Sequence, residues 1–281
     1  MIKPNLKDDA LLADIAAARS DRENFHLWWL GQSGFLVQWQ GRHLLFDPYL
    51  SDSLTRKYAE TEKPHVRMTQ LAIDPARLDF IDVVTSSHNH TDHLDAETLG
   101  PLLKANPNLT VVVPEANRQF AADRLQVASD RLVGADDGKC ADCGDFQLHG
   151  VPAAHETVDR DAQGRCQFMG FVARFGPWSV YHSGDTVVFD GLADRVRPFS
   201  VDVALVPING RAPERKVAGN MWGREAARLA RDMRAKVAIP CHYDMFEFNT
   251  ATPVEFTAAA QKVGQGWCIL QCGERWSSSR E

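Results

Sequence analysis

The sequence predicts an α/β fold in which β-sheets are flanked by helices, in one domain that covers residues 1–281. Short apolar runs with the period of strands form consecutive hairpins near the N-terminus. Farther along, such runs alternate with segments that have the period of helices. No internal repeat, low-complexity tract or linker divides the 281 residues, a length that one large domain can reach.

The first predicted elements are a helix and three strands. Residues 8–19 place Leu11, Leu12 and Ile15 on one helical face, which predicts an amphipathic helix. The apolar runs that follow are separated by Gly-containing turns, as in consecutive hairpins, and cover residues 25–30, 34–39 and 43–46. Residues 52–76 have no clear period, which predicts a long loop with helical turns, and such loops are often functional.

The rest of the chain is predicted to alternate between strands and helices. The predicted strands are 81–86, 110–113, 131–133, 146–151, 167–175, 178–182, 201–207, 236–241 and 267–270. The predicted helices are 95–105, 115–125, 223–234 and 253–263. Cys140 and Cys143 have the gap of a zinc half-site, but no second pair accompanies them, so we interpret them as a surface turn with two reduced thiols.

The composition is that of an ordinary soluble enzyme, with 44% hydrophobic and 24% charged residues. The formal net charge of −6 contains no block of like charges, which argues against a nucleic-acid or anionic membrane surface. No run approaches the roughly 20 apolar residues of a membrane helix, and the N-terminus lacks the apolar core of a secretory signal. We therefore expect a cytoplasmic protein with reduced cysteines. Its tryptophans include candidate interface anchors, which leaves a homo-oligomer open.

The segment Ser87-His88-Asn89-His90-Thr91-Asp92-His93 carries the most chemical information. Three of the ten histidines and an aspartate lie within six residues. Imidazole and carboxylate are common ligands of Zn²⁺, Mn²⁺ and Fe. Because the segment follows an apolar strand, a rigid scaffold would present these ligands on a loop. A polar turn is the structural alternative, but three close histidines rarely have a structural purpose.

Three further candidates lie just after later strands. His155, Asp185 and His242 each follow an apolar run by one to a few residues, as the first cluster does. This repeated placement predicts that the strand ends meet at one site. The residues suffice for two metal ions, the first bound by His88, His90 and His155, the second by Asp92, His93 and His242, and both by the bridging Asp185. Two such ions about 3.5–4 Å apart can hold a shared water and lower its pKa to near 7.

The order His-x-His-x-Asp-His, then a single His, an Asp and a last His, resembles the metallo-β-lactamase superfamily over residues 28–242. The resemblance implies an αββα sandwich of two mixed sheets with a dinuclear metal site at the sheet edges. Phe46-Asp47-Pro48 is similar to the family segment that carries a buried structural aspartate. Asp47 is therefore expected to orient the metal loop or a ligand histidine.

Several stretches look like the branch of the superfamily that contains L-ascorbate-6-phosphate lactonase. These stretches are 28–31, 181–186, 201–205 and 238–240 running into His242. His155 departs from the pattern of that lactonase, so its substrate is not carried over directly.

The resulting hypothesis is a metal-dependent hydrolase that opens an ester-like bond with a metal-bridged hydroxide. The substrate would be a small molecule, with a sugar or sugar-phosphate lactone as the leading candidate, and Asp92 would orient the nucleophile. The cofactors would be two divalent ions per chain, Zn or Mn, with Fe as a further option. The alternatives are a phosphodiesterase acting on a small phosphodiester and a non-catalytic metal-binding sensor. A di-iron oxidoreductase also exists in the superfamily, but the 281 residues contain no flavin-binding partner domain.

Four residues are candidates for substrate contacts. Arg56 and Lys57 in the early loop could bind a phosphate or carboxylate. Asn209 and Arg211 lie in a loop after the strand that ends at Pro207, where they could reach the mouth of the site. A solvated loop explains each of the four equally well. His182, inside a strand, is expected to be packed and hydrogen-bonded.

Overall fold

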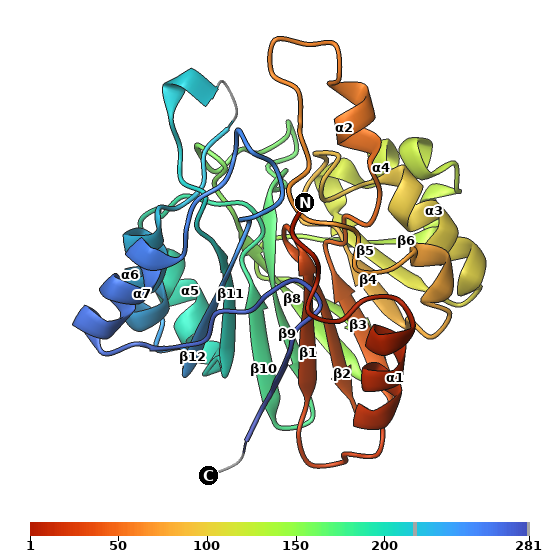
Figure 1. Cartoon of the computed structure of the whole chain (residues 1–281), viewed down its shortest axis with the longest axis horizontal. Helices are drawn as coiled ribbons and strands as arrows, with labels where there is room; N and C mark the ends of the chain where they lie inside the picture. The colour runs from red at the N-terminus through yellow and green to blue at the C-terminus, as the bar shows by residue number, and fades with distance from the viewer. Residues whose placement is uncertain (216–217, 280–281) are drawn as a thin grey trace.

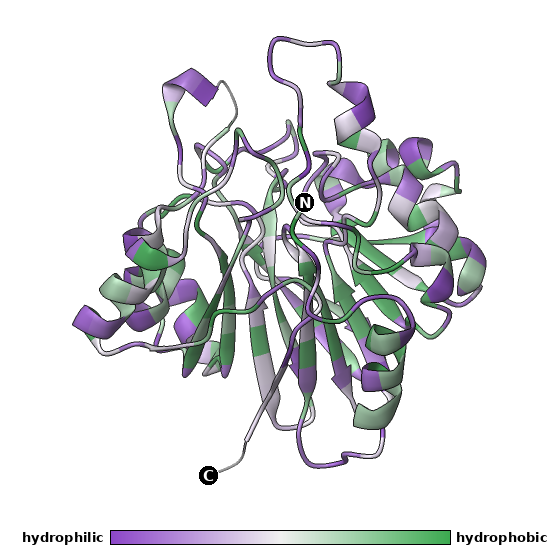
Figure 2. Ribbon diagram, in the orientation of Figure 1, coloured by the Kyte–Doolittle hydropathy of each residue, from purple (hydrophilic) through white to green (hydrophobic). Residues whose placement is uncertain are grey.

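The computed structural model of the protein describes residues 1–215 and 218–279. Two mixed β-sheets pack face to face, and helices cover their outer sides (Figure 1). This arrangement is the αββα sandwich that the family resemblance implied. Green hydrophobic segments follow the strands, while the purple hydrophilic segments concentrate on the outer helices and the loops (Figure 2).

The first sheet has the strand order β14-β1-β2-β3-β4-β5-β6. Its strands are β1 His26–Gly31, β2 Gly34–Trp39, β3 Arg42–Phe46, β4 Val83–Thr85, β5 Thr110–Pro114, β6 Leu132–Ala135 and β14 Arg275–Ser277. The strands β1, β2 and β3 form antiparallel hairpins, whereas β3 to β6 pair in parallel.

The second sheet has the order β13-β12-β11-β10-β9-β8-β7. Its strands are β7 Cys140–Cys143, β8 Phe146–Pro152, β9 Met169–Phe175, β10 Trp178–His182, β11 Val203–Pro207, β12 Val237–Cys241 and β13 Gly266–Trp267. The strands from β7 to β10 are antiparallel, and those from β10 to β13 are parallel. As a result, β8, β10, β11 and β12 all run in one direction.

The helices form the outer layers. The α-helices are α1 Asp9–Ala18, α2 Ser53–Lys57, α3 Ala96–Ala105, α4 Arg118–Leu125, α5 Leu192–Val196, α6 Gly223–Asp232 and α7 Val254–Val263. Short 3₁₀ helices are η1 Pro75–Arg77, η2 Glu115–Asn117, η3 Ser129–Arg131, η4 Arg197–Phe199 and η5 Pro213–Arg215. In Figure 1, α1, α3 and α4 lie beside the first sheet and α5, α6 and α7 beside the second.

Alternate side chains of β1 pack into different layers of the sandwich. Leu27 and Trp29 join the core between the sheets, whereas Trp28 and Leu30 pack against the outer helices of the first sheet. The indole of Trp28 donates to Asp14 of α1 at 2.8 Å, which fixes that helix on the sheet. Because side chains alternate along a strand, one apolar run can supply both cores.

The structure corrects the interpretation of residues 140–143. They are not a surface turn but the edge strand β7, which pairs antiparallel with β8. Ala141 is buried while Cys140 and Asp142 are exposed, the alternation of a strand with one solvated face. The six cysteines are all free, as expected. The sequence analysis also missed α5 and β14, and it extended the last predicted strand beyond the two residues of β13.

Candidate metal centre

The predicted metal ligands follow the carboxyl ends of four strands that meet at one edge of the sandwich. The loop after β4 carries residues 88–93, His155 follows β8, Asp185 follows β10 and His242 follows β12. Gly184 turns the chain after β10 with a φ of +60°, and His242 itself adopts a φ of +63°. The carboxyl ends of strands in α/β sheets commonly carry binding residues.

Asp47 organises the loop after β4. Its carboxylate is fully buried and accepts hydrogen bonds from Nδ1 of His93 at 2.7 Å, the hydroxyl of Thr85 at 2.7 Å and the backbone N–H of Ser87 at 3.1 Å. These bonds tie both ends of the histidine loop to the end of β3. A carboxylate that accepts the second ring N–H of a ligand histidine fixes its tautomer and orientation.

The structure brings the predicted ligands of the first ion together. One ligand atom each of His88, His90 and His155 lies within 4.8 Å of the others. Nδ1 of His155 donates to the backbone carbonyl of Gly219 at 2.8 Å, so its Nε2 is left with the lone pair. The ring of His88 lies beside Ser87, whose hydroxyl is 3.0 Å from Nδ1.

The predicted ligands of the second ion also converge. One atom each of Asp92, His93 and His242 lies within 4.8 Å of the others. The backbone N–H of His242 donates to the carbonyl of Gln32 at 2.9 Å, which joins the end of β12 to the turn between β1 and β2. That contact holds the two sheets together at the site.

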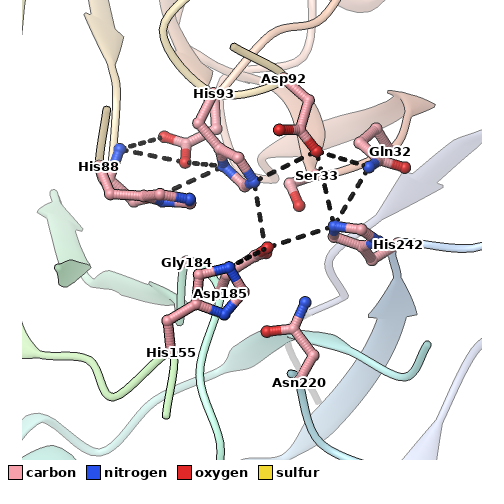
Figure 3. Close-up of polar contacts among 12 residues, drawn as sticks. Gln32, Ser33, His88, Asp92, His93, His155, Gly184, Asp185, Asn220 and His242 are labelled. Carbon is pink, nitrogen blue, oxygen red and sulfur yellow. Dashed lines mark hydrogen bonds and ion pairs between the residues drawn. The ribbon is translucent and has the colours of Figure 1, made fainter. Parts of the chain in front are cut away.

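Asp185 lies between the two groups (Figure 3). Its Oδ2 is 3.6 Å from Nε2 of His155 in the first group and 3.2 Å from Nε2 of His242 in the second. Its Oδ1 is 3.3 Å from Nε2 of His93. A carboxylate with both oxygens directed at imidazoles from both groups is suited to bridge two cations.

Burial and neighbouring charges shift the pKa values of two of these groups. Burial opposes ionisation of Asp185, but the imidazoles of His242 and His93 outweigh it and hold the pKa of that carboxyl well below its usual range. Burial, with the neighbouring imidazoles of His93 and His90, holds the pKa of His88 well below its usual range. An ionised carboxylate and a neutral imidazole are the forms that bind metal.

Unpaired buried atoms test whether a cation fits this site. Nε2 of His88 is buried and makes no hydrogen bond or ion pair within the described part of the chain, while Nε2 of His93 and Oδ1 of Asp185 are buried and have only ion-pair contacts such as the 3.3 Å between them. The same three residues form a group with ligand atoms within 4.8 Å of one another. A buried polar atom without a partner lowers the stability of the fold unless an ion or a water molecule binds to it. The donor set therefore fits a divalent cation.

The centre opens into a pocket of about 390 Å³. Part of its lining is formed by predicted metal ligands, namely His90, Asp92, His155, Asp185 and His242. An aromatic cluster lines another part, where the ring of His65 stacks on Tyr58 at 4.2 Å and lies 4.5 Å from Phe248. The sequence analysis did not single out His65, although it did mark the loop of residues 52–76 as a functional candidate.

The four candidate substrate contacts lie in different places. Lys57 lines the pocket. Arg56 instead pairs with Glu97 and lines a separate hollow. Arg211 forms a two-pronged ion pair with Glu225, and the amide of Asn209 donates to Asn249 behind the pocket lining. Only the position of Lys57 therefore supports a direct contact, among these four residues.

Gln32 is a residue of the centre that sequence reasoning missed. Its amide contacts both Asp92 and His242, as Figure 3 shows. In the sequence it stands in Gly31-Gln32-Ser33, which is indistinguishable from an ordinary hairpin turn. His182, by contrast, is packed as predicted: its Nε2 contacts the carbonyl of Ser33 at 2.9 Å, and its ring stacks on Phe46.

Among the described residues, no helix is long and apolar enough to span a membrane. Residues 42–243 match the family described as "Beta-lactamase superfamily domain". A metal-dependent hydrolase of the UPF0173 group from Opitutus terrae is 30% identical over 254 residues, which cover 88% of this chain and 97% of that protein. One from Hyperthermus butylicus is 29% identical over 229 residues, or 81% of this chain and 87% of that protein.

Solved structures show the same fold at lower identity. A metallo hydrolase from Ignicoccus hospitalis has a TM-score of 0.67 at 20% identity, covering 92% of this chain and 100% of that chain. A possible metal-dependent hydrolase from Veillonella parvula has a TM-score of 0.71 at 16% identity, covering 89% of this chain and 98% of that chain. The relatives named above are metal-dependent hydrolases, so the resemblance to the lactonase branch stays a prediction. The chain belongs to the metallo-β-lactamase superfamily, among its metal-dependent hydrolases.

Proposed function

We propose that this hydrolase opens an ester-like bond, with the lactone of a sugar or sugar phosphate as the leading substrate. The observation that carries the proposal is the position of Asp185 between two groups of ligands at the floor of a pocket. The first ion would be held by His88, His90 and His155, the second by Asp92, His93 and His242, and both by Asp185. When bound, two divalent ions, Zn or Mn with Fe as a further option, would supply an activated water and polarise a carbonyl.

Asp92 is the group of this chain that we assign to the nucleophile. It lines the pocket, and its side chain keeps 17% of its accessible surface, whereas that of Asp185 keeps 3%. Asp92 can therefore contact a water in the pocket while Gln32 and His242 hold its other side. Its role would be to orient that water and accept its proton.

The pocket supports a small anionic or polar substrate. Its volume of about 390 Å³ lies in the range of small-molecule sites. The ammonium group of Lys57 lies over the ring of Tyr58 at 5.1 Å, and both residues line the pocket. This cation would suit a phosphate or carboxylate on the lactone. It equally favours the second candidate function, hydrolysis of a small phosphodiester, for which a two-metal site is also suited.

A substrate panel with matched variants tests the proposal. Metal-loaded protein is assayed against sugar lactones, simple lactones, thioesters and bis(p-nitrophenyl) phosphate. We expect lactone hydrolysis, and at least a 100-fold fall in kcat/KM for Asp92→Ala with the fold retained. Asp130→Ala, at an exposed position of η3, serves as the matched control.

Several outcomes distinguish the candidates. An active, metal-replete Asp92→Ala protein overturns the role of Asp92. Turnover of the phosphodiester alone favours the second candidate. No turnover of any substrate by fully metallated protein would point to a metal-binding sensor. A cytoplasmic location, a homo-oligomer and the lack of nucleic-acid or membrane partners stay predictions.

A further inference from the structure

The side-chain amide of Gln32 lies inside the second group of ligands. Its Nε2 donates to Oδ2 of Asp92 at 2.8 Å and lies 3.1 Å from Nε2 of His242 (Figure 3). Gln32 is 1% exposed, so its amide belongs to the interior of the centre. The two atoms that it contacts belong to residues of the second group, so the amide competes with a cation for them.

The other end of this amide has no partner. Oε1 of Gln32 is buried and makes no hydrogen bond within the described part of the chain. Leaving a buried carbonyl unpaired costs about 1–3 kcal/mol. The backbone carbonyl of Gln32 accepts bonds from the N–H of His242 at 2.9 Å and the indole of Trp29 at 3.0 Å, so the main chain is held in place. Rotation of the terminal amide, which exchanges its nitrogen and oxygen, remains available to the side chain.

We propose that Gln32 is a ligand of the second ion through Oε1. Its terminal amide would rotate when the cation binds, so that Oε1 and Nε2 exchange places. In the absence of a cation, the carboxylate of Asp92 draws the N–H group inward. A cation takes up the lone pairs of Asp92 and His242 and repels an N–H donor. Exchanging the two ends of the amide directs the carbonyl oxygen toward the cation and leaves the shape of the side chain nearly unchanged. No contact to Oε1 opposes this rotation in the described structure.

The two metal positions would then differ in the ligand atoms that they offer. The first would offer three imidazoles beside the shared carboxylate of Asp185. The second would offer oxygens from Asp92, Asp185 and Gln32 beside the nitrogens of His93 and His242. Oxygen ligands favour Mn²⁺, and imidazole suits Zn²⁺. The second position is therefore expected to prefer the harder ion, and the Gln32 amide is part of that preference. This inference rests on the proposed metal centre but not on which bond is cut.

The test measures metal binding without using activity. Metal-stripped wild type and Gln32→Leu are titrated with Mn²⁺ and with Zn²⁺ by calorimetry, and their Co²⁺ forms are compared by visible absorption. The matched control is Gln38→Leu, since Gln38 of β2 is 0% exposed and lies on the same hairpin. Gln32→Met replaces Gln32→Leu if the latter does not fold.

We expect wild type and Gln38→Leu to bind two equivalents alike. Gln32→Leu should bind one equivalent at least about tenfold more weakly, the lower end of losses seen for supporting residues of metal sites. The loss should be larger for Mn²⁺ than for Zn²⁺, and the Co²⁺ spectrum should change.

Unchanged affinities in Gln32→Leu overturn the inference. Weaker binding with an unchanged Co²⁺ spectrum also overturns it, because Gln32 would then act only through Asp92. If the Gln32-dependent binding is found but no substrate is hydrolysed, the proposed function fails and the inference stands. A wild type that binds no divalent ion contradicts both.

Discussion

Asp47 is the residue on which the geometry of the histidine loop depends most. Burial opposes its ionisation, but the imidazoles of His182 and His93 lower the pKa of the carboxyl, so it remains charged in the interior. The charge in turn fixes the ring of His93, which lies in the second group of ligands. The family resemblance predicted such a role for this residue, and its hydrogen bonds to Ser87 and His93 support that prediction.

Asp47→Asn is expected to weaken metal binding about 10–100-fold and to lower the free energy of unfolding by about 1–3 kcal/mol, because one carboxylate oxygen that accepts a hydrogen bond is lost in the interior. Asparagine tolerates the φ of +36° at this position, but it lacks the charge that pairs with His93. Affinity is measured by titrating metal-stripped protein. Asp82→Asn is the control, because the carboxylate of Asp82 also accepts a bond from a backbone N–H, that of His43, but lies just before β4, at the opposite end of that strand from the histidine loop. Equal affinity of Asp47→Asn and wild type would contradict this role.

At the scale of elements, the turn after β10 places Asp185. Gly184 has a φ of +60°, and a Cβ there would lie 2.5 Å from the carbonyl oxygen of Met169 and 2.8 Å from Cβ of Ser87. A side chain would thus push against both β9 and the histidine loop. Glycine is required by the close approach of three backbone segments as well as by its dihedral angle.

Gly184→Ala should lower the free energy of unfolding by about 1–3 kcal/mol more than Gly144→Ala does. Gly144 has a φ of +75° but open space around its Cβ, so the control carries the dihedral cost without the clash. Urea denaturation of both variants gives the difference. If the two variants lose the same stability, the packing around Gly184 is looser than described.

The elements that the sequence predicted well are those with a strong period. The strands β1 to β3, β9 and β10 agree with the predicted runs within a few residues, because each is apolar and bounded by turn residues. The weakly periodic elements were missed. The strand β7 consists of Cys-Ala-Asp-Cys, and its identity depends on pairing with β8, which a local pattern cannot reveal.

The residues of the candidate site also fall into those that the sequence could predict and those that it could not. Histidine and aspartate at strand ends have a recognisable chemistry and order, so their convergence could be predicted. The contact of Gln32 with Asp92 joins residues that are 60 positions apart, and a glutamine in a turn carries no metal signal of its own. The aromatic cluster of Tyr58, His65 and Phe248 likewise depends on how a long loop folds back, which no local pattern specifies.

For the whole molecule, a buried histidine makes stability depend on pH. His43 is 1% exposed, and burial, with the charges of Arg19 and Arg42, lowers its pKa from 6.5 to about 3. Below pH 6.5 the unfolded chain gains a proton there that the folded chain excludes. The contribution of His43 to stability is therefore lost as the pH falls from about 6.5 toward 3.

Between pH 7 and pH 5 this proton uptake should cost the wild type about 2 kcal/mol of unfolding free energy. His43→Leu removes the titrating group and should lose correspondingly less over the same range. Urea denaturation of both proteins at the two pH values gives the comparison. An identical pH dependence would show that other groups dominate.

Metal stoichiometry measured together with hydrolysis tests the central claim most directly. Chelator-stripped protein is titrated with Mn²⁺ or Zn²⁺ while lactone hydrolysis is followed, for the wild type and for Asp185→Asn. The account predicts that the wild type binds two equivalents per chain, that hydrolysis appears only as they bind, and that Asp185→Asn loses both properties. Full lactone hydrolysis by the metal-free protein, or two equivalents bound with wild-type affinity by Asp185→Asn, would contradict it.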